Sequence, residues 1–214
     1  ALELQIEKQI SEGINGVIHM GTTGESPTVS FEEHEEFIRR VVKLVNGRIK
    51  VIAGTGANST SEAVWLTKVA ENAGVDGALS VNPYYNKPTQ KWLIAHYEAI
   101  GKSTKLPIVL YNIPGRSGVN FLPESVNELI KRTDNIVAMK EASGDITQMM
   151  RLIELCGDRL TVLSGDDNML LPLLAVGGKG IISVLSNVIP ADIKKVVTLW
   201  KENKTEEAKK VFYK

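Results

Sequence analysis

Lys140 is the residue in this sequence best suited to covalent chemistry, because it follows the apolar run Ile136–Met139 without a break. A short apolar run before a turn predicts a strand that is buried on both faces. Lysine is seldom buried unless something compensates its charge. This stretch alone leaves two interpretations: Lys140 is the first solvated residue after the strand, or it is a desolvated amine that acts as a nucleophile.

Side chains with hydroxyl or guanidinium groups follow other β-rich runs in the same manner. They are Thr22 and Thr23, Tyr84 and Tyr85, Tyr111, and Arg116. In α/β folds the carboxyl ends of parallel strands meet at one face, where chemistry collects. Taken singly, the threonines fit a turn, the tyrosine pair fits an interface and the arginine fits a solvated loop. Their shared placement favours an active site around Lys140.

Short β-rich runs alternate with stretches whose apolar residues recur at helical spacing. The predicted strands are Gly16–Met20, Val51–Gly54, Ala78–Val81, Ile108–Tyr111, Ile136–Met139, Leu160–Leu163 and Ile181–Val184. The predicted helices include Leu2–Glu12, Glu32–Leu44, Glu62–Ala73, Lys91–Ile100, Pro123–Ile130 and Ile146–Leu155, and a further helix ends the chain. Repeats of this kind predict βα units and a parallel sheet covered by helices.

Two architectures fit such units, an open doubly wound sheet and a (β/α)8 barrel. No Gly-rich phosphate-binding loop follows the first strand, and the units run on without an obvious reversal, which favours the barrel. The predicted fold class is therefore α/β, a (β/α)8 TIM barrel forming one incomplete domain over residues 1–214. The first strand of the barrel is expected to be missing, because the chain begins with the helix Leu2–Glu12.

Composition argues against several classes of function. The 214 residues carry 25 basic and 25 acidic side chains without a long run of either sign, so neither nucleic acid nor a membrane is an expected partner. The single cysteine, Cys156, excludes an internal disulfide and a thiolate zinc site and fits a reducing cytoplasm. The apolar runs are too short to span a bilayer, and no secretory leader is recognised. His19, His34 and His96 lack metal-binding spacing, and a core position is favoured for His19.

Four motifs in this chain resemble those of one protein family. They are Gly21-Thr22-Thr23-Gly24-Glu25-Ser26, Asn82-Pro83-Tyr84-Tyr85-Asn86-Lys87-Pro88, Leu110-Tyr111-Asn112-Ile113-Pro114-Gly115-Arg116-Ser117-Gly118 and Lys140-Glu141-Ala142-Ser143. Over essentially its whole length the chain is similar to the dihydrodipicolinate synthase family, which includes N-acetylneuraminate lyase. The resemblance implies a (β/α)8 barrel, a homo-oligomer that is a dimer or tetramer, and no metal or organic cofactor.

The resemblance also implies a lyase that condenses pyruvate with aspartate-4-semialdehyde to give 4-hydroxy-tetrahydrodipicolinate, in lysine and diaminopimelate biosynthesis. Lys140 is expected to form a Schiff base with pyruvate. Tyr111, Thr22 and Tyr85 are expected to relay protons, with Tyr85 reaching in from a neighbouring subunit. The expected substrate-binding residues are Thr23, Gly165 and Ile182 for pyruvate and Arg116 for the second carboxylate. An ordinary lysine pKa of ~10.4 must fall by about three units for attack near neutral pH, and burial shifts it in that direction.

The same resemblance implies a regulatory site for lysine. Its expected residues are Ser26, His34, Asn58, Glu62 and Tyr84. Phe31 stands where some regulated members carry a histidine. The sequence therefore predicts weak or absent inhibition by lysine.

Two other functions stay open at this point. A related pyruvate-dependent class I aldolase, of the sialic acid or 2-keto-3-deoxy acid type, would keep Lys140 and Tyr111. Such relatives generally vary at the vicinal threonines, the tyrosine pair and Arg116, which argues against this alternative. The second alternative is a non-catalytic fragment, because the chain lacks an initial methionine, the first barrel strand and a C-terminal helical segment that family members carry. We therefore expect a processed, trimmed or partial chain.

Overall fold

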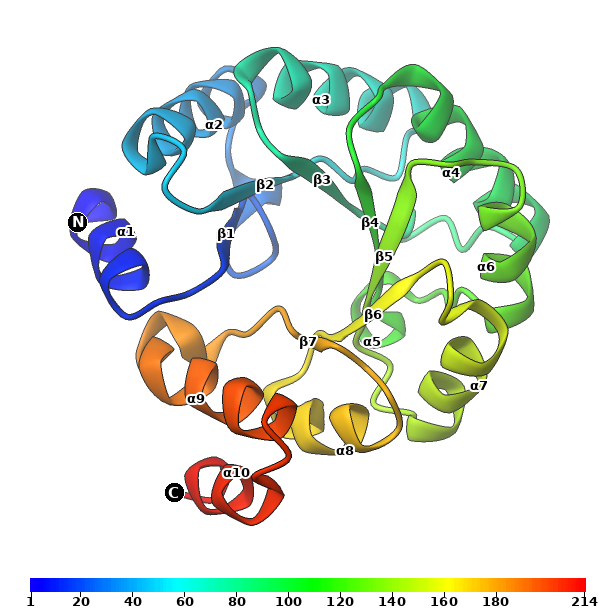
Figure 1. The fold of residues 1–214 in the computed structure, drawn as a ribbon. Helices are drawn as coiled ribbons and strands as arrows, with labels where there is room; N and C mark the ends of the chain where they lie inside the picture. The colour runs from blue at the N-terminus through cyan, green and yellow to red at the C-terminus, as the bar shows by residue number, and fades with distance from the viewer.

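Seven parallel strands form one sheet in the computed structural model, which describes residues 1–214. The strands are β1 (Gly16–His19), β2 (Lys50–Gly54), β3 (Gly77–Val81), β4 (Ile108–Asn112), β5 (Ile136–Glu141), β6 (Thr161–Ser164) and β7 (Gly180–Ile181). Each strand pairs only with its neighbours in chain order, whereas a doubly wound sheet reverses that order. The strands curl around a common centre with the helices outside them (Figure 1). The predicted barrel architecture is confirmed, with seven strands of a (β/α)8 barrel.

Helices connect the strands and cover the outer face of the sheet (Figure 1). They are α1 (Leu2–Ser11), α2 (Phe31–Val45), α3 (Thr60–Ala73), α4 (Gln90–Ser103), α5 (Pro114–Ser117), α6 (Pro123–Ile130), α7 (Ile146–Cys156), α8 (Leu170–Ala175), α9 (Pro190–Lys201) and α10 (Thr205–Phe212), with short 3-10 turns η1 (Ser26–Thr28), η2 (Asp167–Met169) and η3 (Leu185–Asn187). All the periodic helices predicted by range are present. Helix α8 was not predicted, because its sequence LLPLLA is apolar throughout and shows no helical period. None of the helices has the length and apolar character needed to cross a membrane.

Local sequence signals explain where the helices begin and end. Ser30 begins α2 with a capping box, and the Asp145 carboxylate accepts two backbone N–H groups at the start of α7. Asn46 and Gly74 end α2 and α3 in the left-handed conformation, which these residue types tolerate. Ser59 precedes α3, but its hydroxyl contacts another serine and caps no N–H group.

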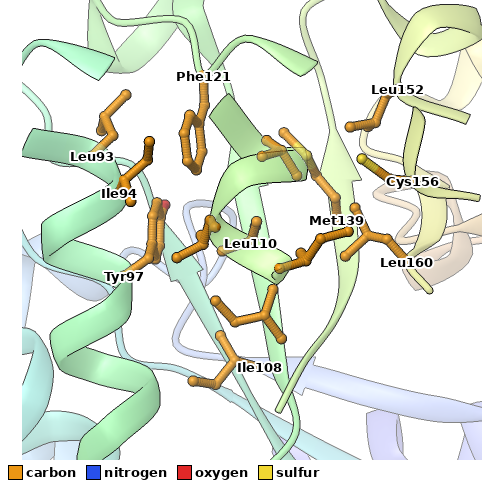
Figure 2. Close-up of a cluster of buried hydrophobic side chains, with 14 of the residues drawn as sticks. Leu93, Ile94, Tyr97, Ile108, Leu110, Phe121, Met139, Leu152, Cys156 and Leu160 are labelled. Atoms are coloured by element: carbon orange, nitrogen blue, oxygen red, sulfur yellow. The ribbon is translucent and has the colours of Figure 1, made fainter. Parts of the chain in front are cut away.

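The alternation of side chains along the strands divides the core into two parts. Residues that face into the barrel form a small cluster of Leu79, Val109, Tyr111, Ala138 and Ala142. Residues that face outward, such as Leu110 and Met139, join a larger cluster with the surrounding helices (Figure 2). Because successive side chains of a strand point to opposite faces, β5 turns Lys140 inward and Glu141 outward.

The seventh strand is shorter than the sequence predicted. The run Ile181–Val184 was expected to be a strand, but pairing stops at Ile181. The Asp167 carboxylate accepts hydrogen bonds from the Ser183 hydroxyl and from the backbone N–H groups of the two residues that follow it. These bonds turn the chain into η3 before the strand can continue, so the prediction is wrong for residues 182–184.

Helix α1 bridges the two ends of the sheet. The outer edges of β1 and β7 have no strand partner. From one side of α1, Gln5, Lys8 and Gln9 donate to backbone carbonyl oxygens of residues 186–188 at 2.8, 2.7 and 2.7 Å. In Figure 1 this places α1 beside the chain that leads into α9. Side-chain contacts therefore connect the first and last parts of the barrel where no strand lies between them.

Two buried histidines make the fold sensitive to acid. His19 is 8% exposed and has no partner for either ring nitrogen, and His96 is 4% exposed with one nitrogen unpartnered. Burial lowers the pKa of each ring to about 4, and the charge of His34 adds to this at His19. The unfolded chain then binds more protons, so the stability contribution is complete above the ordinary pKa of 6.5 and is lost towards pH 4.

We expect the free energy of unfolding to fall by about 2 kcal/mol per histidine between pH 7 and pH 5. Urea denaturation at the two pH values measures the decrease. The variant His19→Leu replaces the ring with an apolar side chain of similar size. Its free energy of unfolding should therefore fall clearly less between pH 7 and pH 5 than that of the unaltered chain. An undiminished decrease in this variant would assign the acid sensitivity to other groups and contradict the prediction.

Candidate active site

Lys140 and Tyr111 face each other from neighbouring strands. Strands β4 and β5 pair in a register that places Tyr111 opposite Lys140. The Lys140 Nζ atom lies 4.2 Å from the centre of the Tyr111 ring, close enough for the aromatic face to attract an ammonium group. An amine and a phenol thus share one small space at the carboxyl ends of the strands, where the sequence analysis expected them.

Burial makes the Lys140 amine easier to deprotonate than an ordinary lysine. Desolvation lowers its pKa from 10.5 to about 8, while the negative charges of Asp166 and Asp167 act in the opposite direction. A pKa of this size leaves ~10% of the amine uncharged at pH 7, against well under ~0.1% for an ordinary lysine. Lys140 is therefore not the solvated lysine of the simpler interpretation, and it has the free amine that attack on a carbonyl requires.

Gly165 lies against Lys140 because it has no side chain. A Cβ atom at this position would lie 2.6 Å from the Ala142 Cβ atom and 3.0 Å from the Lys140 Cε atom. Close-packed interiors do not hold carbon atoms at such distances without movement. The backbone after β6 therefore closes one side of the lysine, and any larger residue would displace the amine from Tyr111.

Tyr111 keeps its proton at the pH where part of Lys140 is a free amine. It is 5% exposed, and burial raises its pKa above the ordinary value. A hydrogen-bonding contact with Thr22 and the positive charge of Arg116 act in the opposite direction, and the charge of Asp166 adds to the increase. The phenol can therefore donate a proton to an oxygen that forms beside the amine, and Thr22 is in position to exchange it.

A cavity of about 930 Å³ opens beside this pair. Its lining includes eight of the predicted residues: Thr22, Ser26, His34, Glu62, Tyr84, Tyr85, Tyr111 and Arg116. A cavity of this volume suits a small molecule. The lining does not include the other five: Thr23, Asn58, Lys140, Gly165 and Ile182. Lys140 is connected to the cavity through Tyr111, which borders it and contacts the lysine.

The turn that holds Thr22 and Thr23 is fixed by a close backbone contact. Both threonines are exposed after β1. A Cβ atom at Gly54, the last residue of β2, would overlap the carbonyl oxygen of Met20. A glycine at position 54 therefore allows the turn to approach the end of β2 and brings Thr22 to Tyr111.

Ile182 and Arg116 approach the pair from other strand ends. Ile182 packs against the inward-facing cluster that contains Tyr111, and its N–H group donates to the Ser164 carbonyl at 2.9 Å. Arg116 is exposed in α5, which follows β4 directly. Both residues therefore lie at the face where the sequence analysis expected substrate contacts.

Tyr85 borders the cavity but is not enclosed by this chain. Its side chain is 89% exposed. Its backbone has a φ of 75°, a left-handed conformation that bulky residues rarely adopt. Within one chain Tyr85 does not complete a proton relay with Thr22 and Tyr111.

No role was predicted for the two aspartates that follow β6. Asp166 and Asp167 are the acidic groups whose charge reaches Lys140. Asp167 also holds the segment after β7 through the hydrogen bonds described above. The available signal was a vicinal acidic pair directly after a predicted strand, which is where the carboxyl ends of the strands meet.

The fold and the site define a class of protein: a (β/α) barrel with a partly buried lysine at the end of a strand, suited to forming Schiff bases with carbonyl substrates. No three or more His, Cys, Asp or Glu side chains group closely enough to hold a metal ion. The chain belongs to the dihydrodipicolinate synthetase family, whose model matches residues 1–214.

Individual relatives match nearly the whole of this chain. A 4-hydroxy-tetrahydrodipicolinate synthase of Leptospira biflexa is 52% identical over 209 residues, 98% of this chain and 71% of the relative. The solved 4-hydroxy-tetrahydrodipicolinate synthase of Methylacidiphilum fumariolicum SolV has a TM-score of 0.98 and 48% identity over 99% of this chain and 71% of its own. A dihydrodipicolinate synthase from Acinetobacter baumannii, solved in complex with pyruvate, has a TM-score of 0.96 and 42% identity over 99% of this chain and 72% of its own.

Proposed function

We propose that this chain is a lyase that condenses pyruvate with aspartate-4-semialdehyde to give 4-hydroxy-tetrahydrodipicolinate, in the biosynthesis of lysine and diaminopimelate. The observation that carries the proposal is the partly buried Lys140 amine against the Tyr111 ring in a member of the dihydrodipicolinate synthetase family. The names of the relatives and the pyruvate complex of one of them support the choice of substrates. A cytoplasmic location, which fits the unpaired Cys156, stays a prediction.

The proposed reaction begins with a bond between Lys140 Nζ and the carbonyl carbon of pyruvate. The carbonyl oxygen takes up protons, for which the Tyr111 hydroxyl is placed, and leaves as water when the imine forms. The imine nitrogen draws electrons from the pyruvate methyl group, which loses a proton to give an enamine. The enamine carbon then attacks the aldehyde carbon of the second substrate, and a new carbon–carbon bond forms while the aldehyde oxygen is protonated. The amino group of the second substrate next attacks the imine carbon and closes the ring, and the bond from that carbon to Lys140 Nζ breaks, which frees the lysine.

Two groups suit the carboxylates of the substrates. The turn at Thr22 and Thr23 offers hydroxyl and N–H donors to the carboxylate of pyruvate, and Gly165 and Ile182 are proposed to complete its surroundings. The Arg116 guanidinium can bind both oxygens of the second carboxylate at once. Arg116 and Thr22 line the same cavity as Tyr111, which supports binding of both substrates next to the amine.

The decisive experiment is to trap the imine. The protein is incubated with pyruvate and sodium borohydride, which reduces the imine to a stable amine, and is then weighed by mass spectrometry and mapped by peptide analysis. We expect one adduct, located on Lys140. An adduct on another lysine, or none at all, would refute the proposal. If Lys140 is trapped but protein that has not been treated with borohydride forms no condensation product from pyruvate and aspartate-4-semialdehyde, the synthase activity is refuted.

We further propose that two copies of this chain assemble so that Tyr85 enters the active site of the partner. The exposed side chain and left-handed backbone of Tyr85 support this, because a single chain provides nothing that encloses it. One solved neighbour, with a TM-score of 0.97 and 42% identity, is described as a monomeric variant of dihydrodipicolinate synthase. Sedimentation of this chain with and without Tyr85→Ala tests the assembly, and a monomer at all concentrations would exclude it.

We propose that the lysine site lies in the same cavity. Ser26, His34, Glu62 and Tyr84 border it, while Asn58 does not. The His34 ring contacts the Gly54 carbonyl oxygen at 2.9 Å. Phe31 is 50% exposed and meets the Trp65 ring edge-on at 5.2 Å, so an apolar side chain stands beside the proposed site. One solved neighbour, from Cyanidioschyzon merolae, is described with lysine bound.

We expect millimolar lysine to leave the condensation rate of this chain nearly unchanged, because Phe31 cannot hydrogen-bond a bound amino acid. Phe31→His should bring measurable inhibition, and Phe31→Leu is the matched control without a hydrogen-bonding group. Calorimetric titration with lysine provides a second readout that does not depend on turnover. Strong inhibition of the unaltered chain would show that the prediction is wrong.

A further inference from the structure

A chain of buried hydrogen bonds lies behind the reactive pair, on the outer side of the sheet. The Tyr97 hydroxyl donates to Asn82 Oδ1 at 2.7 Å, and Asn82 Nδ2 donates to Asn112 Oδ1 at 2.7 Å. Asn112 Nδ2 in turn donates to the Glu141 oxygens at 3.0 and 3.2 Å. All four side chains are 0% exposed. These three links run in one direction and end at the Glu141 carboxylate. The Tyr97 hydroxyl also lies 3.1 Å from the Ser80 carbonyl oxygen, and Asn112 Nδ2 also donates to Asn120 Oδ1 at 2.8 Å.

Every neighbour of the Glu141 carboxylate is a hydrogen-bond donor. Besides Asn112, the backbone N–H group of Ser143 donates at 2.7 Å and Gln148 Nε2 donates at 3.2 Å. A protonated carboxyl group needs an acceptor for its own O–H, and these amide and backbone N–H groups provide none. Burial raises the pKa of Glu141 above its ordinary value, and the surrounding donors oppose this only in part. The set of amide and backbone N–H donors around the two oxygens is nevertheless the arrangement that suits an ionised carboxylate.

Two backbone N–H groups fix the direction of this network. The Phe121 N–H donates to Asn112 Oδ1 at 3.0 Å, so the Asn112 amide cannot turn over without losing that bond. The Ser143 N–H likewise requires an acceptor at Glu141. In Glu141→Gln, the NH2 group of the glutamine would face the Asn112 or Ser143 donor. Neither donor can turn away, so one of them would lose its acceptor. A buried donor left without a partner costs roughly 1–3 kcal/mol.

The network is placed to control the distance between the reactive groups. In the register of β4 and β5, Asn112 lies opposite Glu141, directly after Tyr111 opposite Lys140. We propose that Glu141 is a positioning residue for the Schiff-base chemistry: by binding Asn112 across the two strands, it holds the Tyr111 ring against the Lys140 amine. This inference rests on the proposed function, since it concerns the formation of the imine on Lys140.

The charged groups around Lys140, together with its exposure to water, determine its pKa. Asp166 and Asp167 act on it from the end of β6, and Tyr111 covers it from β4. Arg116 acts on Tyr111. If the two strands separate, water reaches the amine and its pKa rises towards the ordinary value. Loss of the Glu141 charge alone would shift the Lys140 pKa in the opposite direction, so the sign of the shift distinguishes the two effects.

The test compares the unaltered chain with Glu141→Gln in the pyruvate and borohydride assay, with the rate of adduct formation measured across pH. The rate of adduct formation rises with pH as Lys140 loses its proton. In Glu141→Gln we expect the midpoint of this rise to lie about one pH unit higher, which reduces the rate at neutral pH by about tenfold. An unchanged or lowered midpoint, whatever the melting temperature, would overturn the inference. If the unaltered chain forms no adduct, the proposed function fails, which is a separate result.

A second pair of variants keeps the test decisive if Glu141→Gln does not fold. Gln148→Ala removes one donor to Glu141 from α7 and leaves both strands unchanged, so a smaller upward shift of the midpoint is expected. Thr133→Val removes a buried hydrogen bond to the Leu129 carbonyl before β5, away from the carboxyl ends of the strands. This control should keep the midpoint of the unaltered chain. An equal shift in the control would reduce the role of Glu141 to general stability and overturn the inference.

Discussion

Replacing Lys140 with methionine should abolish the covalent capture of pyruvate and reduce the condensation rate by at least on the order of 10³-fold. Methionine has a similar length and fits an irregular apolar space, but it has no amine to attack a carbonyl. Because no other lysine is placed against Tyr111, nothing in the site can replace the missing group. Mass spectrometry after borohydride treatment measures the capture, and a coupled assay with aspartate-4-semialdehyde measures the rate.

The same substitution should stabilise the protein at neutral pH. Burial lowers the pKa of Lys140 from 10.5 to about 8, which corresponds to a cost of up to about 3 kcal/mol for holding the charged form in the folded chain. The cost is present in full below pH 8 and disappears as the pH rises past 10.5, above which the lysine is neutral in both states. The stability difference between Lys140→Met and the unaltered chain should therefore shrink over this range, as urea denaturation can show.

Lys87→Met is the matched control for this experiment. Lys87 borders the same cavity, and the substitution removes an amine without touching Lys140. It should form the pyruvate adduct at the rate of the unaltered chain. Capture of pyruvate by Lys140→Met, or its loss in Lys87→Met, would contradict the assignment of the nucleophile.

The sequence was sufficient for the parts of the fold that depend on local periodicity. Runs such as Ile108–Tyr111 are apolar on both faces and become strands, and Asn46 and Gly74 end helices because they tolerate the left-handed conformation. Local patterns do not predict the backbone conformation where a side chain distant in the sequence determines it. Nothing in Ile181–Val184 shows that Asp167 accepts the N–H groups of Val184 and Leu185 and so ends the strand early.

The site likewise contains residues that the sequence could predict and residues whose role depends on the tertiary fold. Lys140 and Tyr111 each end a strand, and parallel pairing of consecutive strands brought them together without further information. The role inferred for Glu141 could not be read in advance. Its carboxylate points away from the site, and its partners Asn112, Ser143 and Gln148 come from a strand, a loop and a helix that only the fold brings together. Tyr85 is the opposite case, because its predicted role needs a second chain.

Replacing Tyr111 with phenylalanine should slow imine formation by about 10²- to 10³-fold, because the hydroxyl that exchanges protons with the developing carbinolamine is lost. The ring that covers Lys140 at 4.2 Å is kept, so the packing around the amine should change little. Given enough time, the adduct on Lys140 should still accumulate. Rapid mixing with pyruvate, followed by borohydride at increasing times, separates a slower rate from a lost site.

The difference between the two substitutions is what identifies Tyr111 as the proton carrier. Lys140→Met should give no adduct at any time, whereas Tyr111→Phe should give a full adduct slowly. Thr22→Val, which leaves the phenol in place, should slow the reaction less than Tyr111→Phe, and the exposed Tyr213→Phe should not slow it. An unchanged rate in Tyr111→Phe would mean that water or another hydroxyl carries the proton, and Tyr111 would then serve only to cover the amine.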